Sequence, residues 1–232
     1  MNNIKFFTQH EQLKETLPPV PASKFWPQWF KDQGTGSFDT PNREGSNTVK
    51  SCPAMLDVLN MGYIIPLWAD FKLMRQTNND ISWLSPNPEM YGIDFHLEEQ
   101  IDAYPFGPDT FKGTVKLINP WQVRTAPGYS CMFVSPYYHK HNNLEVLVGS
   151  VDTDRYHEAH VNTFLTSATN EEVKLDYGMP LMQVIPYKRE EFKMETLVGD
   201  YRSSICKAMQ FVHESLFAAQ SYRKKLSPKW FK

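Results

Sequence analysis

The sequence predicts a mainly β protein with a sandwich or barrel-like body. A short helix is expected in its N-terminal half and one long helix at its C-terminal end. Phe, Tyr and Trp make up 14% of the 232 residues and 17 residues are Pro, a composition that favours short strands joined by ordered turns. Runs of alternating or continuous apolar residues, bounded by Pro and Gly, correspond to about eight to ten strands.

The first element is a short strand at Ile4–Phe7, followed by the Pro-rich segment Leu17–Phe30. Its prolines impose extended geometry. Its large aromatic side chains, Phe25, Trp26 and Trp29, are residue types that often anchor interfaces. We therefore expect an arm that packs either on its own domain or on a partner.

A short helix is predicted at Ser51–Gly62, where a capping Ser and an early Pro precede apolar residues and a Gly ends the run. The next strand, Tyr63–Met74, contains Pro66, which indicates an edge or a bulge. A hairpin through Asn78-Asn79-Asp80 connects it to a second strand at Ile81–Leu84.

The clearest strands lie in the second half of the chain. Leu144–Val151 is aliphatic but interrupted by Gly149, which suits a bulge. The remaining predicted strands share short apolar or alternating patterns between Pro and Gly turns: Thr114–Ile118, Gln122–Thr125, Tyr129–Val134, His160–Thr166 and Met179–Tyr187.

The long helix is predicted at Asp200–Tyr222, where apolar residues follow one helical stripe: Ile205, Met209, Val212 and Leu216. The simplest division of the chain is an arm and loop at 1–50, a β body at 51–198, and a helix with a basic tail at 199–232.

Composition narrows the class of function. The net charge is −2 and the pI about 6.4, so neither general nucleic-acid binding nor binding to an anionic membrane is expected. No apolar run is long enough to span a membrane, and the first fifteen residues lack the apolar core of a signal peptide. Three widely spaced cysteines, Cys52, Cys131 and Cys206, indicate buried thiols in a reducing compartment.

The polar residues of most interest follow Val151. If Asp152, Asp154 and Tyr156 lie on an extended segment, their side chains share one face. Two carboxylates could hold magnesium beside a phosphate. The alternative is a turn at the end of a strand, in which the aspartates accept hydrogen bonds from the backbone.

This order of residues is similar to part of the trimeric dUTPase and dCTP deaminase superfamily. The matching positions are Gly149, Val151, Asp152, Asp154, Tyr156, Gly178 and Gln183. The resemblance implies a dUTPase-like (β-clip) body, an aspartate that orients the attacking water, a tyrosine on the base and a glutamine that reaches phosphate. The family's phosphate motif has no counterpart before Gly149, and its Gly-rich C-terminal motif is absent, so we expect the fold to carry over without the catalysis.

A second candidate site is His139, His141 and Glu145, which have the spacing of the first cupin metal motif. Imidazoles with a carboxylate suit iron, manganese or zinc. The same segment also fits an exposed Asn-rich loop, which we favour because two nearby histidines do not complete a metal shell. No cofactor is therefore expected, unless a nucleotide site brings magnesium.

Several strings, among them PVPASKFWPQWF, INPWQVRTAPGYSCMF and GMPLMQVIPYKRE, resemble an uncharacterised protein family of tailed phages and some bacteria. The resemblance suggests a phage-encoded protein. Together with a β body, aromatic Pro-rich arms and no complete active site, it favours a virion structural or assembly protein in the host cytoplasm and the assembled virion. We expect a homo-oligomer, with a trimer as one candidate, that contacts other virion proteins and is not catalytic. The alternative is a nucleotide-binding or nucleotide-hydrolysing enzyme.

Overall fold

The computed structural model describes residues 3–34, 48–88, 91–141 and 143–196. Within these ranges the chain is mainly β, as the sequence predicts, and every strand pair is antiparallel. The described residues divide into two compact units. The first falls within Met1–Phe25 and Met61–Arg189, and the second within Trp26–Asn60 and Glu190–Lys232. None of the described helices is long and apolar enough to cross a membrane.

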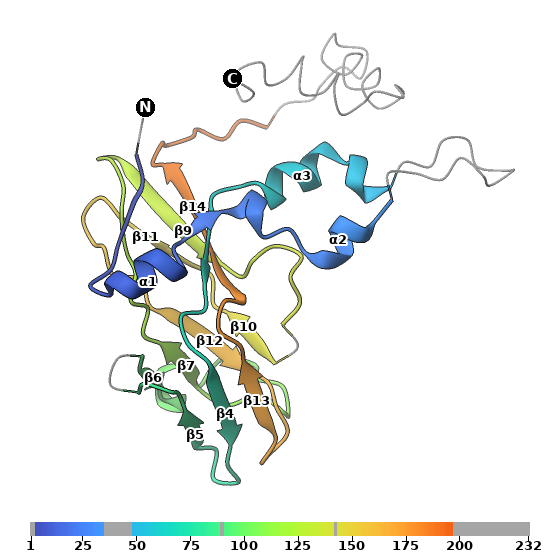
Figure 1. The fold of residues 1–232 in the computed structure, drawn as a ribbon, viewed down its shortest axis with the longest axis vertical. Coiled ribbons are helices and arrows are strands. Elements are labelled where there is room, and N and C mark those ends of the chain that lie inside the picture. Colours follow the sequence, from blue (N-terminus) through green and yellow to red (C-terminus); the bar gives the residue numbers. More distant parts are fainter. Residues whose placement is uncertain (1–2, 35–47, 89–90, 142, 197–232) are drawn as a thin grey trace, which may run out of the picture. The chain divides into compact units, whose positions relative to one another are not determined.

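The first unit contains a five-stranded sheet (Figure 1). Its strand order is β11 (Gly149–Val151), β9 (Tyr129–Val134), β14 (Pro180–Lys188), β3 (Tyr63–Pro66) and β2 (Val20–Pro21). The central strand, β14, pairs with β9 on one side and with β3 on the other. Residues 181–185 of β14 are all buried, which explains why this strand shows a nearly continuous apolar run instead of an alternating one.

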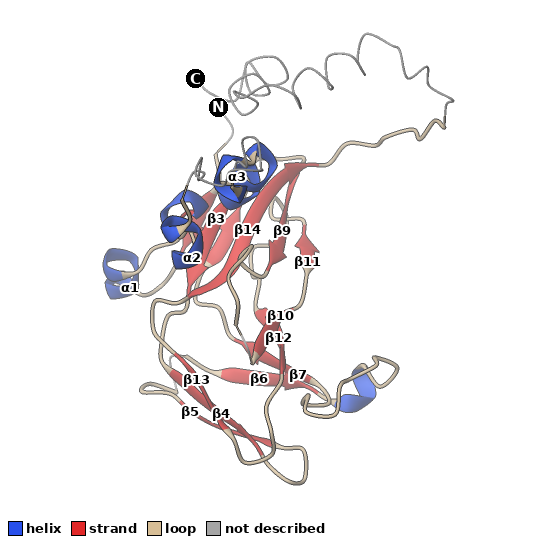
Figure 2. Cartoon of the chain, turned by 90° about the vertical axis from the view of Figure 1, so that its right-hand side faces the viewer, coloured by secondary structure: helices blue, strands red, loops and turns tan. Residues whose placement is uncertain are grey.

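Two more sheets of the first unit lie beyond the end of the five-stranded sheet (Figure 2). One has the order β10 (Leu144–Val146), β12 (Val161–Leu165), β7 (Thr114–Leu117) and β6 (Ile93–His96); the other has β13 (Glu172–Leu175), β4 (Phe71–Arg75) and β5 (Ile81–Leu84). A two-stranded sheet joins β1 (Lys5–Phe7) to β8 (Gln122–Arg124). None of these sheets closes into a barrel within the described residues.

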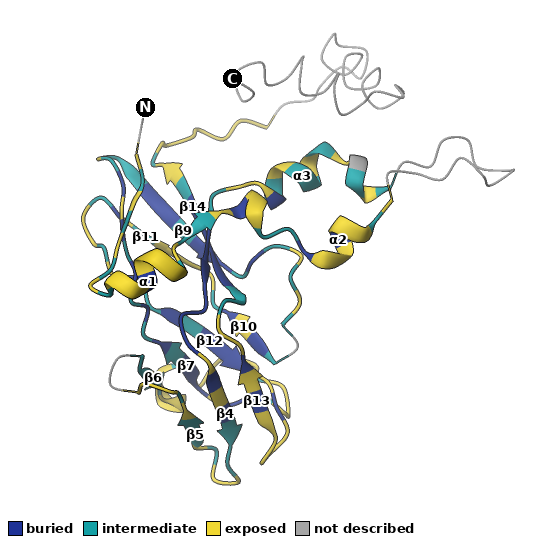
Figure 3. Cartoon of the chain, viewed as in Figure 1, coloured by how far each residue is buried: buried dark blue, intermediate teal, exposed yellow. Residues whose placement is uncertain are grey.

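One hydrophobic core serves all these sheets, in a sandwich-like arrangement (Figure 3). It takes Leu73 from β4, Val123 from β8, Val161 from β12 and Met182 from β14. Strands with one solvated face alternate between buried and exposed residues, because successive side chains point to opposite faces. In β13, for example, Val173 and Leu175 are buried and the residues beside them are exposed.

The helices are short. The first unit has α1 (Glu11–Thr16) and the 3₁₀ turns η1 (Ala22–Lys24) and η3 (Glu98–Gln100); the second has α2 (Gln28–Asp32), η2 (Val49–Ser51) and α3 (Pro53–Leu59). The predicted helix at Ser51–Gly62 is confirmed as α3, which begins with Pro53 in its first turn. Its N-cap residue is Cys52, not Ser51 as the sequence indicated.

Two predicted strands are wrong in extent, because each divides between two sheets. Tyr63–Met74 forms β3 and then β4, and Leu144–Val151 forms β10 and then β11. Between β3 and β4 the backbone makes hydrogen bonds to the turn that precedes β14. The N–H of Leu67 donates to the carbonyl of Met179, and the carbonyl of Leu67 accepts from the N–H of Gly178. The predicted helix at Asp200–Tyr222 lies outside the described residues.

Candidate functional site

The segment that carries Asp152, Asp154 and Tyr156 is a turn, not an extended strand. It follows the edge strand β11, and the backbone N–H groups of Arg155 and Tyr156 both donate to the carbonyl of Asp152, at 2.8 and 2.9 Å. The expected period-two alignment of the three side chains therefore does not apply, because that geometry requires an extended backbone.

Arg189, at the end of β14, binds both aspartates. Its Nη1 lies 3.0 Å from Oδ1 of Asp154 and 3.1 Å from Oδ1 of Asp152, and its Nη2 contacts Oδ2 of Asp154. The same Nη1 donates to the hydroxyl of Ser130 at 2.8 Å. The two N–H groups of Nη1 donate to Ser130 and Asp154, so the contact with Asp152 is an ion pair. Nη1 and Nη2 together hold both oxygens of Asp154 in the paired geometry that a planar guanidinium allows.

Strand β9 completes the cluster. The N–H of Gly128, in the turn before β9, donates to Oδ2 of Asp154 at 2.8 Å, and the hydroxyl of Ser130 donates to Oδ1 of Asp152 at 2.7 Å. Both carboxylates thus connect the ends of β9, β11 and β14, three neighbouring strands of one sheet. We call Gly128, Ser130, Asp152, Asp154 and Arg189 the strand-end cluster.

The electrostatics of this cluster favour the ionised form of Asp154. Hydrogen bonds from Arg189 and from the Gly128 backbone hold the pKa of Asp154 at about 2, below its ordinary 3.8. In return, the hydrogen bond to Asp154 raises the pKa of Arg189. A carboxylate with so low a pKa is a weak general base near neutral pH, since effective bases have pKa values close to the working pH.

Gln183, the residue that the superfamily resemblance assigns to phosphate, is buried in β14 with 2% of its surface exposed. Its Oε1 accepts from the N–H of Tyr137 at 3.0 Å, and its Nε2 donates to the carbonyl of Met61 at 2.6 Å. The amide therefore connects two loops to the central strand. A buried amide satisfied in this way has a structural role in the fold.

Gly178 lies in a turn with left-handed backbone geometry, whereas Tyr156 is an exposed residue after the aspartate turn. Gly178 has φ = 82°, a left-handed conformation that suits glycine, and its N–H donates to the carbonyl of Leu67 at 2.7 Å. Tyr156 follows the aspartate turn with 58% of its surface exposed. The nucleotide-binding roles that the resemblance implies for these residues remain predictions.

The histidines of the predicted metal site contact two different parts of the backbone. His139 Nε2 lies 2.6 Å from the carbonyl of Phe25, and His141 Nε2 lies 2.9 Å from that of Pro180. Glu145 is an exposed residue of β10. In the described part of the chain no three His, Cys, Asp or Glu side chains gather as metal ligands would, so His139, His141 and Glu145 do not form the predicted set.

The predicted interface aromatics belong to the two units. Phe25 ends the first part of the first unit, whereas Trp26 and Trp29 belong to the second. There, both indoles pack edge-on against the buried ring of Phe30, with centroid separations of 5.4 and 5.6 Å, and Trp26 Nε1 donates to Oδ1 of Asn60 at 3.0 Å. Trp29 keeps 44% of its surface exposed, and its role as an anchor remains a prediction.

Sequence reasoning missed Arg189 and Ser130. Both are far from Asp152 and Asp154 along the chain, and neither belongs to a local motif. The one available signal was the continuous strand that runs through Tyr187 and Lys188 to Arg189, which puts a cation directly after the end of the central strand.

No protein-family model matches the chain, and no curated protein matches it either. The strand-end cluster and the buried amide of Gln183 must therefore be interpreted from their own geometry.

Proposed function

We propose that this protein is a non-catalytic structural or assembly protein of a phage virion and that it acts as an oligomer, with a trimer as one candidate. The observation that carries the proposal is the strand-end cluster. Asp152 and Asp154, the carboxylates that could orient a water molecule, instead bind Arg189 and groups of β9. Bound in this way, they stabilise the edge of the sheet.

The proposal includes a dUTPase-like β body. Its support is the order of Gly149, Asp152, Asp154, Gly178 and Gln183 in the sequence, together with the antiparallel sheets. In this body, Gln183 holds the loops at Met61 and Tyr137 in place of a phosphate. The assignment to a virion rests on the resemblance of the longer sequence strings to tailed-phage proteins.

Exposed apolar side chains support self-association. Phe192 and Met194, in the described part of the chain after β14, have 89% and 86% of their surface exposed. Leaving such side chains in water costs about 25 cal/mol per Å² of apolar surface, so contact with another copy would stabilise them. The edge strand β11 pairs only with β9 among the described strands. Its free edge is a second surface, where a strand of another copy could extend the sheet.

Light-scattering mass measurement tests the proposal. The chain mass is 27.0 kDa, and we expect a fixed multiple of it for the wild type. Phe192→Asp with Met194→Asp should lower the mass, whereas Lys193→Ser, between the two apolar residues, should leave it unchanged. A wild-type protein that stays at the single-chain mass at every concentration would overturn the proposal.

A further inference from the structure

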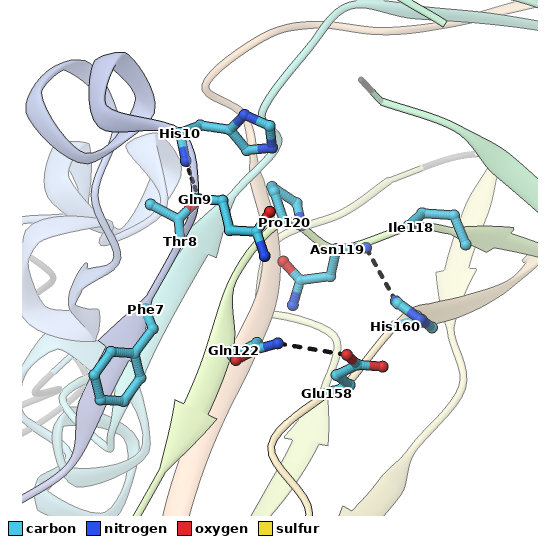
Figure 4. Close-up of a pocket in the computed structure, with 10 residues that line it drawn as sticks. All are labelled: Phe7, Thr8, Gln9, His10, Ile118, Asn119, Pro120, Gln122, Glu158 and His160. Atoms are coloured by element: carbon cyan, nitrogen blue, oxygen red, sulfur yellow. Dashed lines mark hydrogen bonds between the residues drawn. The ribbon is translucent and has the colours of Figure 1, made fainter. Parts of the chain in front are cut away.

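A pocket lies between the N-terminal segment and the loops that flank β8 and β12 (Figure 4). Its volume is about 310 Å³, near the lower end of the range of about 300–1,000 Å³ for small-ligand sites. One wall is the segment from Phe7 to His10; the other is the loop around Asn119 with Glu158 and His160. The antiparallel pairing of Phe7 with Gln122 brings these distant segments together.

Asn119 forms a rigid part of the pocket wall. Its Oδ1 accepts from the N–H of Trp121 at 3.0 Å, and its Nδ2 donates to the carbonyl of Ala159 at 2.9 Å. With both ends of its amide engaged and 8% of its surface exposed, this residue fixes the loop and the backbone next to His160.

His160 is held as a neutral donor. Its Nδ1 accepts from the backbone N–H of Asn119 at 3.3 Å, so the ring proton belongs on Nε2. Burial, with a smaller contribution from Lys116, lowers the pKa of His160. The nearby carboxylates of Glu158 and Asp94 oppose this effect without reversing it. His160 therefore lines the pocket as a neutral ring that carries its proton on Nε2.

The other polar side chains supply acceptors and further donors. Glu158 is exposed, and its Oε1 makes only a long contact, 3.4 Å, with Nε2 of Gln122. Gln9 is exposed, and Figure 4 shows its amide extending from the N-terminal segment toward Asn119. Pro120 and Ile118 add apolar groups to the lining.

We propose that this pocket binds a neutral sugar residue. Sugar hydroxyls donate and accept together, which matches a carboxylate, a neutral imidazole N–H and two amides around a partly apolar surface. An anion would meet the negative charge of Glu158 among the lining groups. A divalent cation would need a larger set of acidic or histidine ligands than the described residues gather anywhere.

Saturation-transfer NMR with a panel of neutral monosaccharides at millimolar concentration tests the proposal on the full chain. We expect transfer to at least one sugar. Glu158→Gln should weaken binding about tenfold or more, since it removes a charged acceptor, and Gln9→Ala about fivefold. Gln9→Ala changes an exposed side chain, so it tests the site without threatening the fold. The matched controls are Glu172→Gln, on β13 in another sheet, and Gln12→Ala, an exposed glutamine of α1.

Binding that weakens in both pocket variants and survives in both controls supports the proposal. No transfer to any sugar from folded wild-type protein would overturn it. Equal affinities for the pocket variants and the wild type would place the sugar elsewhere and would also overturn it. A nucleoside that binds the pocket while every sugar fails would overturn the ligand class.

Discussion

The substitution Gln183→Leu tests whether Gln183 stabilises the fold or serves to bind a ligand. Leucine is close to glutamine in size but leaves both the N–H of Tyr137 and the carbonyl of Met61 without their partner. Each buried polar group left unsatisfied costs about 1–3 kcal/mol. Because Met61 and Tyr137 are only partly covered, water can replace part of what is lost, and we expect a total near the low end, about 3 kcal/mol.

That loss corresponds to a fall in melting temperature of about 6–12 °C, at about 2–4 °C per kcal/mol for a domain of this size. Denaturant unfolding and calorimetry on the purified variant measure it. Gln12→Leu, on the exposed side of α1, is the control and should change the melting temperature little. A Gln183→Leu protein as stable as the wild type would refute the reasoning and would return Gln183 to a ligand-binding role.

Three other variants test the strand-end cluster and the turn before β3. Because the folded pKa of Asp154 is about 2 and its ordinary value 3.8, its ionisation stabilises the protein above pH 4, and this contribution is lost as pH falls toward 2. Asp154→Asn should therefore melt below the wild type at pH 7, and the gap should narrow between pH 4 and 2; a gap that stays constant across that range would contradict the assignment. Gly62→Ala should destabilise by about 2 kcal/mol or more, since φ is 71° and a Cβ would lie 2.1 Å from the carbonyl oxygen of Val184. Gly128→Ala, with φ = 83° but open space around it, should cost only about 1–2 kcal/mol, and equal unfolding free energies for the two variants would refute the steric argument.

The sequence predicted strands well where one face is solvated or where an apolar run is short. The strands β7, β9 and β12 are confirmed within a residue or two of their predicted ends. The hairpin of β4 with β5 is confirmed at its turn, although β4 begins at Phe71 and the predicted strand at Tyr63. The local pattern is enough to predict these strands, because the alternation of apolar and polar residues determines which face of the strand is buried. The hairpin turn also has the expected chemistry, with Asn79 at φ = 64°.

The same patterns could not show where the chain changes sheets. Leu144–Val151 has uniform β composition, yet its first half pairs with β12 and its second half with β9. Gly149 marks the break locally, but it predicts only a bulge, since the change of sheet depends on partners far along the chain. β13 was missed although its residues alternate, because it has only four residues and its pairing with β4 joins positions about a hundred apart.

The candidate site illustrates the same limit. The sequence singled out Asp152 and Asp154, and a turn, one of the two geometries considered for them, is what the structure shows. It could not identify Arg189, which follows 35 positions after Asp154 and decides what the carboxylates bind. Because β14 pairs with β9, Arg189 at its end lies beside the aspartates, and only the order of strands in the sheet shows this proximity.

The most direct test of the account is a melting experiment on the wild-type protein with dUTP, dCTP and other deoxynucleotides in the presence of magnesium. A ligand that binds the native state raises the melting temperature by mass action. If Asp152, Asp154 and Gln183 serve the fold, no deoxynucleotide should shift the melting temperature. A shift of several degrees with dUTP or dCTP, abolished by Asp152→Asn in a protein that remains folded, would contradict the account and establish a nucleotide site.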